Sequence, residues 1–301
     1  AGRVITITAA RRRAATRRRR SREASASTTT AATQTGDTID FHLASCIMCV
    51  RAGGQVIMDY WGKRGQFLVE EQGRNDYVTV ADREAEDAIT RVVRARFPDH
   101  HIVAEESGSS AGSVGYRWYI DPLDGTTNFV HGYPLFCVSV GIADPQGMRA
   151  AAVYDPLRDE LFTAARGRGA MLNGEAIRVS AIARLTQGLI VTGIPFRSLD
   201  RLEEYMLSLR AVLEGSAGIR RDGSAALNLA YAACGRYDGF WEMGLSSWDV
   251  AAGSLIVREA GGVVTDFEGR QGYIDSGDII AANPEIHSSL LTIVRSAYRT
   301  E

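Results

Sequence analysis

"YIDPLDGTTNF", residues 119–129, places two carboxylates at the end of an apolar run. The run, YRWYI at 116–120, has the composition of a buried strand. Pro122 fixes one backbone torsion and has no N–H, so we expect the strand to end there and Asp121 and Asp124 to face one point. Taken alone, DPLDG is also typical of a surface turn, because Asp, Pro and Gly all favour turns.

Gly125 and Thr126 follow the second acid directly. Glycine permits a tight turn, which would expose the N–H groups of both residues. Exposed N–H groups at a turn or a helix start bind phosphate, and the Thr126 hydroxyl would lie within reach of the same point. The stretch therefore predicts an anion site beside a pair of acids. His131 is interpreted as a surface residue, with a place at the site entrance as the alternative.

Helix-like and strand-like segments alternate along the chain without a regular βαβ repeat. Residues 38–60 have helical periodicity, and residues 77–98 begin as a short strand and continue as a helix. Residues 101–107 are expected to form a strand that ends in two glutamates. From 136 to 174 the period is nearer two and glycines mark hairpins, including GRGAMLNG at 167–174.

The C-terminal half alternates again, and its last helix begins at a proline. The whole pattern predicts a mixed fold of the α+β or mixed α/β class. The expected strands are 188–196, 217–223, 237–244, 263–269 and 278–283, and the expected helices are 199–214, 224–235, 248–262 and 284–299.

The composition is that of an ordinary soluble globular protein, with 45% hydrophobic and 23% charged residues. No run approaches 18 uninterrupted apolar residues, so no transmembrane helix is predicted. The four cysteines are too few for a disulfide scaffold. Cys46 and Cys49 match C-x-x-C but lie in a helical pattern, which favours small core residues over a redox or metal site.

Charge is distributed unevenly between a basic tail and an acidic body. Residues 1–36 contain nine Arg and one acid, about +8, and the remainder carries 25 basic and 35 acidic residues, about −10. An Arg-, Ala-, Ser- and Thr-rich tail that is poor in acids is typical of an organelle transit peptide, and we expect it to be disordered. A nucleic-acid-binding arm and a misassigned start, since no Met begins the chain, are the alternatives. The acidic body argues against nucleic-acid binding through a broad basic face.

Six carboxylates occupy the same kind of position along the chain. They stand at strand ends or helix starts, where α/β folds place ligand sites. A converging set of acids without His or thiolate suits a hard cation such as Mg²⁺, which takes oxygen ligands. Without a cation, such neighbouring carboxylates would repel one another. The six are Glu105, Asp121 and Asp124 at strand ends, Asp82 and Asp249 at helix starts, and Glu242 near a strand end.

Five motifs, in order, give a family resemblance. They are DYVTVAD ending at Asp82, AEES containing Glu105, DPLDGTTNF, GSAALNLAYAACGRYDGFWEMG and WDVAAGSLIVREAGG. From about residue 38 to residue 298 the sequence resembles the inositol monophosphatases, lithium-sensitive and Mg²⁺-dependent sugar phosphatases. The resemblance implies the layered αβαβα sandwich shared with the fructose-1,6-bisphosphatase type, a catalytic domain over residues 37–301, and a homodimer.

The resemblance also implies which residues bind metal. Two or three Mg²⁺ ions would be held by the carboxylates of Glu105, Asp121, Asp124 and Asp249 and by the backbone carbonyl of Leu123. A water activated by one of these ions would attack phosphorus in line, so no phosphoenzyme is required.

The remaining roles implied by the resemblance concern water and substrate. Asp82 and Thr126 would hold or activate the attacking water. Gly125 and Thr126 would donate N–H groups to the phosphate. The alcohol or sugar would be contacted by Glu242 and by the segment Gly223, Ser224 and Ala225.

The substrate ranking follows from the same resemblance. Thr127 and Asn128 favour the inositol branch, so inositol monophosphates rank first, galactose 1-phosphate and similar sugar phosphates next, and histidinol phosphate third. Family members usually carry a Lys upstream of the acid aligned at Asp82. Here Arg74 stands in that region, which leaves third-metal affinity and lithium response open.

A regulatory alternative comes from a bacterial branch of the family that acts as a partner in ribosomal-RNA transcription. Residues 192–197 and 220–245 resemble that branch, although the full set of metal acids favours catalysis. The expected partner is therefore a small phosphorylated polyol or sugar, with no membrane or nucleic acid. The tail predicts plastid targeting, with the cytoplasm as the alternative.

Overall fold

The computed structural model describes residues 40–63, 69–73, 76–113, 115–195 and 199–298. The chain divides into two units, Ala1–Phe41 and His42–Glu301, and the architecture below is that of the second. The predictions made for the tail, residues 1–36, and for Arg74 lie outside the described residues.

An eight-stranded mixed sheet carries the first part of YIDPLDGTTNF in β5 (Arg117–Asp124). From Trp118 onward the strand is buried, as its apolar composition predicts. β5 runs parallel to β3 (His101–Ala104), so the ends of these two strands meet at one edge. The sheet order is β10 (Glu175–Ile177), β9 (Gly169–Leu172), β8 (Glu160–Ala165), β7 (Gly147–Asp155), β6 (Cys137–Asp144), β5, β3 and β4 (Gly108–Ser110).

Pro122 does not end the strand, so that prediction was wrong. β5 continues to Asp124, and its pairing with β6 passes from Asp121 opposite Ser139 to Asp124 opposite Cys137. The register shifts between these two pairs, so Pro122 lies in an irregular, bulge-like segment. A bulge needs no ladder donor from the proline nitrogen, and it keeps both acids at the same end of the strand.

The short strand β4 lies where the sequence predicted only a loop. It folds back antiparallel on β3, with Gly108 opposite Ala104. Gly108 has a φ of 73°, a left-handed conformation that glycine adopts at little cost. An edge strand made of Gly and Ser has little apolar patterning, which explains why the sequence did not reveal it.

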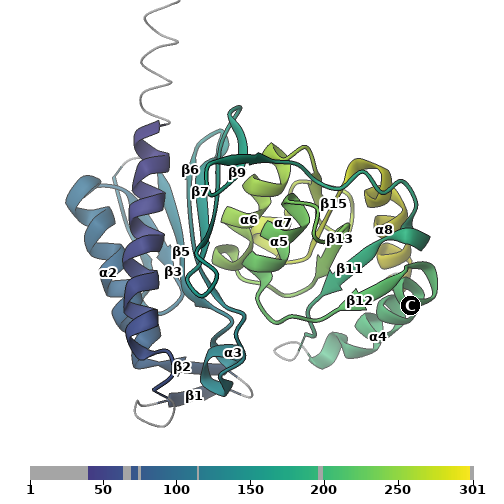
Figure 1. Cartoon of the computed structure of the whole chain (residues 1–301), viewed down its shortest axis with the longest axis horizontal. Coiled ribbons are helices and arrows are strands. Elements are labelled where there is room, and N and C mark those ends of the chain that lie inside the picture. The colour runs from purple at the N-terminus through teal and green to yellow at the C-terminus, as the bar shows by residue number, and fades with distance from the viewer. Residues whose placement is uncertain (1–39, 64–68, 74–75, 114, 196–198, 299–301) are drawn as a thin grey trace, which may run out of the picture. The chain divides into compact units, whose positions relative to one another are not determined.

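The helix Asp40–Tyr60 and α2 (Val80–Arg96) cover one face of this sheet (Figure 1). A side chain added at Gly53 would collide with Ile89 of α2 and crowd Val138 of β6. Cys46 and Cys49 are fully buried with free thiols, which confirms that they are core residues.

The same helix is long and apolar enough to cross a membrane, judged by length and composition alone. A core helix passes that test equally well, and 44% of its most apolar window is buried within the fold. Val50 and Ile57 join the two cysteines in having no exposed surface. We therefore assign the helix to the core.

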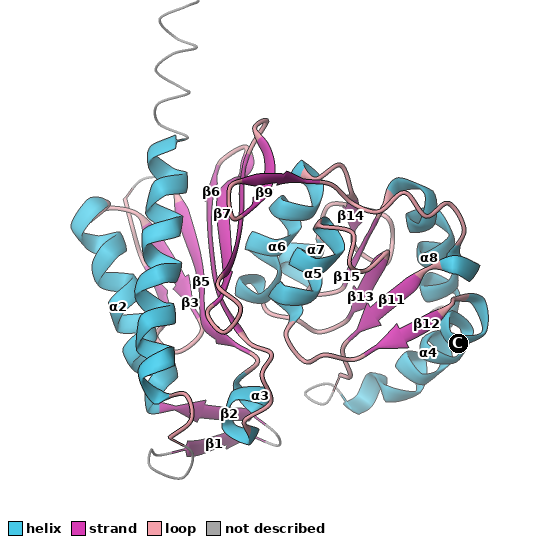
Figure 2. Ribbon diagram, viewed as in Figure 1, coloured by secondary structure: helices cyan, strands magenta, loops and turns pink. Residues whose placement is uncertain are grey.

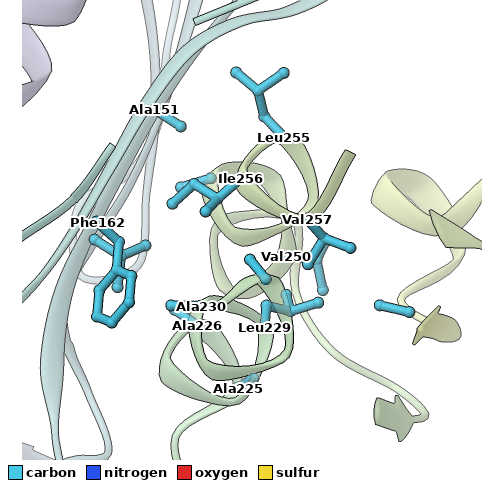
Figure 3. Packing of buried hydrophobic residues seen from close by; sticks show 14 of the residues in the cluster. Ala151, Phe162, Ala225, Ala226, Leu229, Ala230, Val250, Leu255, Ile256 and Val257 are labelled. Carbon is cyan, nitrogen blue, oxygen red and sulfur yellow. The ribbon is translucent and has the colours of Figure 1, made fainter. Parts of the chain in front are cut away.

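Helices α5 (Ala225–Ala233) and α6 (Ser247–Glu259) form the middle layer and carry the larger core cluster. Figure 3 shows Ala226 and Ala230 of α5 turned toward Phe162 of the eight-stranded sheet. Small side chains let the two helices approach closely: a Cβ on Gly253 would lie 2.6 Å from Leu229. The Ala- and Gly-rich sequence of these helices therefore fits a place between two sheets.

A five-stranded sheet follows, and α4 (Leu202–Gly215) and α8 (Pro284–Ala297) form the outer layer (Figure 2). Trp241 and Ile280 of this sheet share a core cluster with Tyr205 of α4 and Ile286 of α8. The layers therefore run helix, sheet, helix, sheet, helix, which confirms the predicted αβαβα sandwich. The strand order is β12 (Gly218–Arg220), β11 (Leu189–Thr192), β13 (Gly239–Glu242), β15 (Ile279–Ala282) and β14 (Val263–Thr265).

Each strand and helix predicted for the C-terminal half is present, most of them shorter than predicted. Several short elements were not predicted. They are α3 (Thr126–His131), α7 (Tyr273–Ser276), a 3-10 turn at Leu185–Gln187 and the strand β1 (Val69–Gly73). β1 pairs antiparallel with β2 (Asp76–Thr79), which is the short strand predicted at the start of 77–98, and the predicted helix 199–214 begins with a 3-10 turn at Leu199–Arg201.

Candidate active site

A pocket of about 410 Å³ opens at the end of β5. Ten of the twelve predicted site residues line it. The other two, Asp82 and Ser224, lie behind the pocket wall, where each bonds to a residue of the lining. The ten lining residues are Glu105, Asp121, Leu123, Asp124, Gly125, Thr126, Gly223, Ala225, Glu242 and Asp249.

Asp121 lies at the centre of the acids and is 1% exposed. Its Oδ1 accepts a hydrogen bond of 3.0 Å from the N–H of Leu123, across the bulge. Burial raises the pKa of Asp121 well above its usual range, and the carboxylates of Glu105, Asp124 and Asp249 raise it further. Because one N–H donor does not offset three neighbouring carboxylates, a positive charge would stabilise the ionised form of Asp121.

The acids converge without forming a closed metal cage. Among the described residues, no group of three or more His, Cys, Asp or Glu side chains is already arranged around a metal position. The donor set nevertheless fits a hard cation, because it consists of carboxylate oxygens around Asp121 and the nearby carbonyl of Leu123. Soft thiolate ligands are not offered, since burial holds the pKa of the neighbouring Cys137 thiol well above its usual range.

Asp124 is held by the start of α5. Its Oδ2 accepts hydrogen bonds of 2.6 Å from Ser224 Oγ and from the N–H of Ala226, and its Oδ1 accepts one of 3.2 Å from the N–H of Ala225. Burial raises the pKa of Asp124, and these donors partly offset that effect. The predicted substrate segment thus anchors a predicted metal ligand.

Asp82 is the N3 residue of α2 and forms a capping box with Thr79. Its Oδ2 accepts hydrogen bonds from the Thr79 N–H at 2.8 Å and from the Thr79 hydroxyl at 2.5 Å. Its Oδ1 lies 3.1 Å from Thr126 Oγ1, which also lies 3.0 Å from the carbonyl of Leu123. Burial raises the pKa of Asp82 to about 6. The Asp82 carboxyl therefore lies next to Thr126 of the pocket lining, with a pKa near neutrality.

Asp249 uses the same device at the start of α6. It is an N3 residue whose Oδ2 accepts a hydrogen bond of 2.7 Å from the N–H of Ser246. A carboxylate in the first turn of a helix is stabilised by the free N–H groups and by the helix dipole. Both helix-start acids, Asp82 and Asp249, are thus fixed by local capping before any ligand binds.

The predicted phosphate turn is formed by Gly125, which has a φ of 101° and caps α3. A side chain there would press on the carbonyl of Leu135 and on Phe136. The conformation and the crowding both require glycine, so the turn is fixed by sequence.

Two lining residues, Arg221 and Leu245, were not singled out by the sequence, and two more, Thr127 and His131, were discussed without being among the predicted site residues. His131 is exposed and also lines the pocket, so both interpretations given for it are met. Arg221 is separated from Gly223 by a single residue, and that closeness to a predicted segment was the available signal. Asn128 is absent from the lining, because its Nδ2 donates to the carbonyls of Leu135 and Asp222 at 2.8 and 2.9 Å.

Known proteins resemble the chain over nearly all of the residues that the structure describes. The inositol monophosphatase family model matches residues 43–299. The Nus factor SuhB of Pseudomonas aeruginosa is 46% identical over 254 residues, which cover 83% of this chain and 94% of that protein. The Nus factor SuhB of Escherichia coli is 42% identical over 250 residues, with coverage of 83% and 94%.

Solved structures give the same result for the fold. The extragenic suppressor protein suhB from Bartonella henselae matches with a TM-score of 0.81 at 42% identity, covering 84% of this chain and 97% of that chain. The inositol monophosphatase from Anabaena matches with a TM-score of 0.76 at 37% identity, covering 86% and 97%. By sequence and by fold, the chain belongs to the inositol monophosphatase family.

Proposed function

We propose that the chain is a Mg²⁺-dependent phosphomonoesterase that hydrolyses small phosphorylated polyols, with inositol monophosphates as the first substrate. The observation that carries this proposal is the convergence of Glu105, Asp124 and Asp249 on the buried Asp121. The turn at Gly125, with N–H groups suited to phosphate, lines the same pocket. Family membership supports phosphatase chemistry in general.

The carboxylates of Glu105, Asp121, Asp124 and Asp249, with the carbonyl of Leu123, would hold two or three Mg²⁺ ions. When bound, Mg²⁺ offsets the repulsion among these acids, lowers the pKa of a water and stabilises charge on the leaving oxygen. The chain contributes the fixed directions of the acids, set by the β5 bulge and by the capping box of α6.

Asp82 and Thr126 position the attacking water in this proposal. The Thr126 hydroxyl donates to Asp82 Oδ1 and offers its oxygen to a water proton. As the water oxygen bonds to phosphorus and the ester P–O bond breaks, the water proton passes toward Asp82 through Thr126. The departing alcohol oxygen takes a proton from solvent, and inorganic phosphate is the second product.

The substrate preference rests on the lining residues that would contact the alcohol. Thr127 lines it, but Asn128 is engaged with backbone carbonyls, so only the first of these residues is placed to favour one alcohol over another. Glu242, Gly223 and Ala225 offer contacts for the alcohol. Sugar 1-phosphates and histidinol phosphate are the next candidates.

Phosphate release from inositol 1-phosphate, measured with and without MgCl₂, tests the proposal. We expect Mg²⁺-dependent release by the wild-type chain and its loss in Asp121→Asn. A panel with galactose 1-phosphate and histidinol phosphate ranks the substrates. If the folded wild-type chain releases no phosphate from any of them, the enzymatic proposal is wrong.

A second candidate function follows from the names of the relatives, several of which are Nus factors. We propose as the alternative that the chain acts as a binding partner in transcription. Replacement of the Escherichia coli relative by this chain in living cells tests it. Growth rescue by both wild type and Asp121→Asn would favour the partner role, and rescue by the wild type alone would favour catalysis.

A further inference from the structure

Gly193 lies directly beside Glu242 although the two residues are far apart in sequence. Strands β11 and β13 are parallel neighbours, with Thr192 opposite Trp241. Gly193 directly follows β11 and therefore comes alongside Glu242, the last residue of β13. Gly193 is buried, and Glu242 lines the pocket.

The carboxylate of Glu242 occupies the space that a side chain at Gly193 would take. A Cβ built on Gly193 would lie under 3.0 Å from Cδ, Oε1 and Oε2 of Glu242, a separation that real Cβ atoms essentially never show. Gly193 has no left-handed φ, so its backbone does not require glycine. Glycine is needed at this position because it has no side chain, and not because of its backbone freedom.

The frame around this pair cannot easily yield. Trp241 is fully buried, stacks on Tyr205 with ring centroids 6.5 Å apart, and donates from Nε1 to Ser208 Oγ at 3.3 Å. On the other side, Val191 and Thr192 of β11 are at most 1% exposed, so both strands are held by packing up to the residue before Gly193. A methyl group added at Gly193 would move the flexible end of Glu242, because the strands resist displacement.

We propose that Gly193 is a specificity-determining positioning residue that keeps the Glu242 carboxylate at the pocket wall, where it reads hydroxyl groups of a polyhydroxylated phosphomonoester. This inference rests on the proposed phosphatase function and adds a residue that sets its selectivity for the alcohol. Glu242 accepts hydrogen bonds from neutral polyols, and its charge disfavours alcohols that carry a second negative group. The position of its carboxylate then decides which ring hydroxyls it reaches.

Steady-state kinetics of the full chain with Mg²⁺ test the proposal. The two substrates are inositol 1-phosphate, which is rich in hydroxyls, and 4-nitrophenyl phosphate, which has none. We expect Gly193→Ala to raise KM for inositol 1-phosphate roughly tenfold, the size of one lost charged hydrogen bond, with kcat within about twofold. KM for 4-nitrophenyl phosphate should stay unchanged.

A double-mutant cycle separates positioning from general damage. Glu242→Gln should give the same selective rise in KM, and in the Gly193→Ala background it should add little. Gly218→Ala is the matched control, because Gly218 lies on the neighbouring strand β12 and an added Cβ meets only ordinary contacts. The control should behave as wild type.

Three results would overturn the proposal while leaving the phosphatase function intact. One is an unchanged KM for inositol 1-phosphate in Gly193→Ala. The second is full additivity of the two substitutions, and the third is an equal rise in KM for both substrates. Absence of phosphate release by the wild-type chain would overturn the proposed function itself, and this inference with it.

Discussion

The two walls of the pocket differ in how they hold their side chains. The wall built by the eight-stranded sheet presents Asp121 and Asp124, which are 1% and 9% exposed and are fixed by backbone N–H groups. The wall built by the five-stranded sheet presents Glu242, half-buried, and Arg221, exposed. The first wall is a rigid, strained arrangement of like charges, and the second is a more open surface. We infer that the first performs the reaction and the second selects the alcohol.

Asp121→Asn should lower the activity that we assign to the first wall, with the largest effect of the substitutions considered. Losing the central carboxylate removes metal stabilisation of the transition state, which is about 4 kcal/mol or roughly 1,000-fold in kcat. The variant should fold normally, because a buried carboxylate with a raised pKa is replaced by a neutral group of the same shape. Phosphate release and Tm are the measurements.

Asp87→Asn is the control for Asp121→Asn, since it removes one negative charge from an exposed site on α2. It should leave kcat unchanged. A kcat of Asp121→Asn within tenfold of wild type would contradict the assignment of the reaction to the first wall.

Removing Mg²⁺ should reveal the strain of the first wall as a dependence of stability on pH. Burial raises the pKa of Asp121, Asp124 and Asp82, the last to about 6. Groups with raised pKa values stabilise the fold while protonated, and this contribution is lost as pH rises from about 4 through the raised values. For Asp82 alone, about two pKa units correspond to about 3 kcal/mol.

The measurement is the increase in Tm that Mg²⁺ produces at pH 5 and at pH 7.5, against NaCl of equal ionic strength. The increase should be several degrees larger at pH 7.5, because the ion offsets charges that are fully developed only there. Equal increases at both pH values would show that the acids are not the source of the strain.

Asp82→Asn should sharpen the comparison, because Asp82 lies behind the first wall and touches no predicted metal ligand side chain. With the pKa of Asp82 at about 6, the carboxylate becomes a base as pH rises through that value, so kcat should rise across the same interval. The substitution should lower kcat roughly 100-fold and leave KM nearly unchanged. It should also abolish the rise of kcat near pH 6 in the pH–rate profile. Persistence of that rise in Asp82→Asn would assign it to another group.

The first wall could be predicted from the sequence because its positions are fixed locally. Asp82 and Asp249 are capping residues whose spacing from Thr79 and Ser246 is visible in the sequence. Gly125 likewise indicates a turn, because glycine favours the left-handed conformation found there. Strands ending in acids bring their carboxylates to one edge. Local rules of this kind need no knowledge of partners distant in sequence.

The remaining features depend on such partners. The passage of β5 through Pro122 is decided by its pairing with β6, and the Glu242 carboxylate lies in the space left by the missing side chain of Gly193, just beyond β11. Asn128 entered the substrate ranking together with Thr127, but its amide donates to the carbonyls of Leu135 and Asp222. These are tertiary contacts, and a spacing along the chain does not encode them.

Arg221→Ala should give the smallest effect and so define the second wall. The side chain is exposed, and a charge in solvent contributes at most about 1 kcal/mol to a contact. KM for inositol 1-phosphate should rise less than about fivefold and kcat should stay unchanged. Arg220→Ala is the matched control, because that arginine is exposed and does not line the pocket. A fall in kcat for Arg221→Ala, absent from the control, would place this arginine with the reacting groups. It would contradict the inference that the first wall performs the reaction and the second only selects the alcohol.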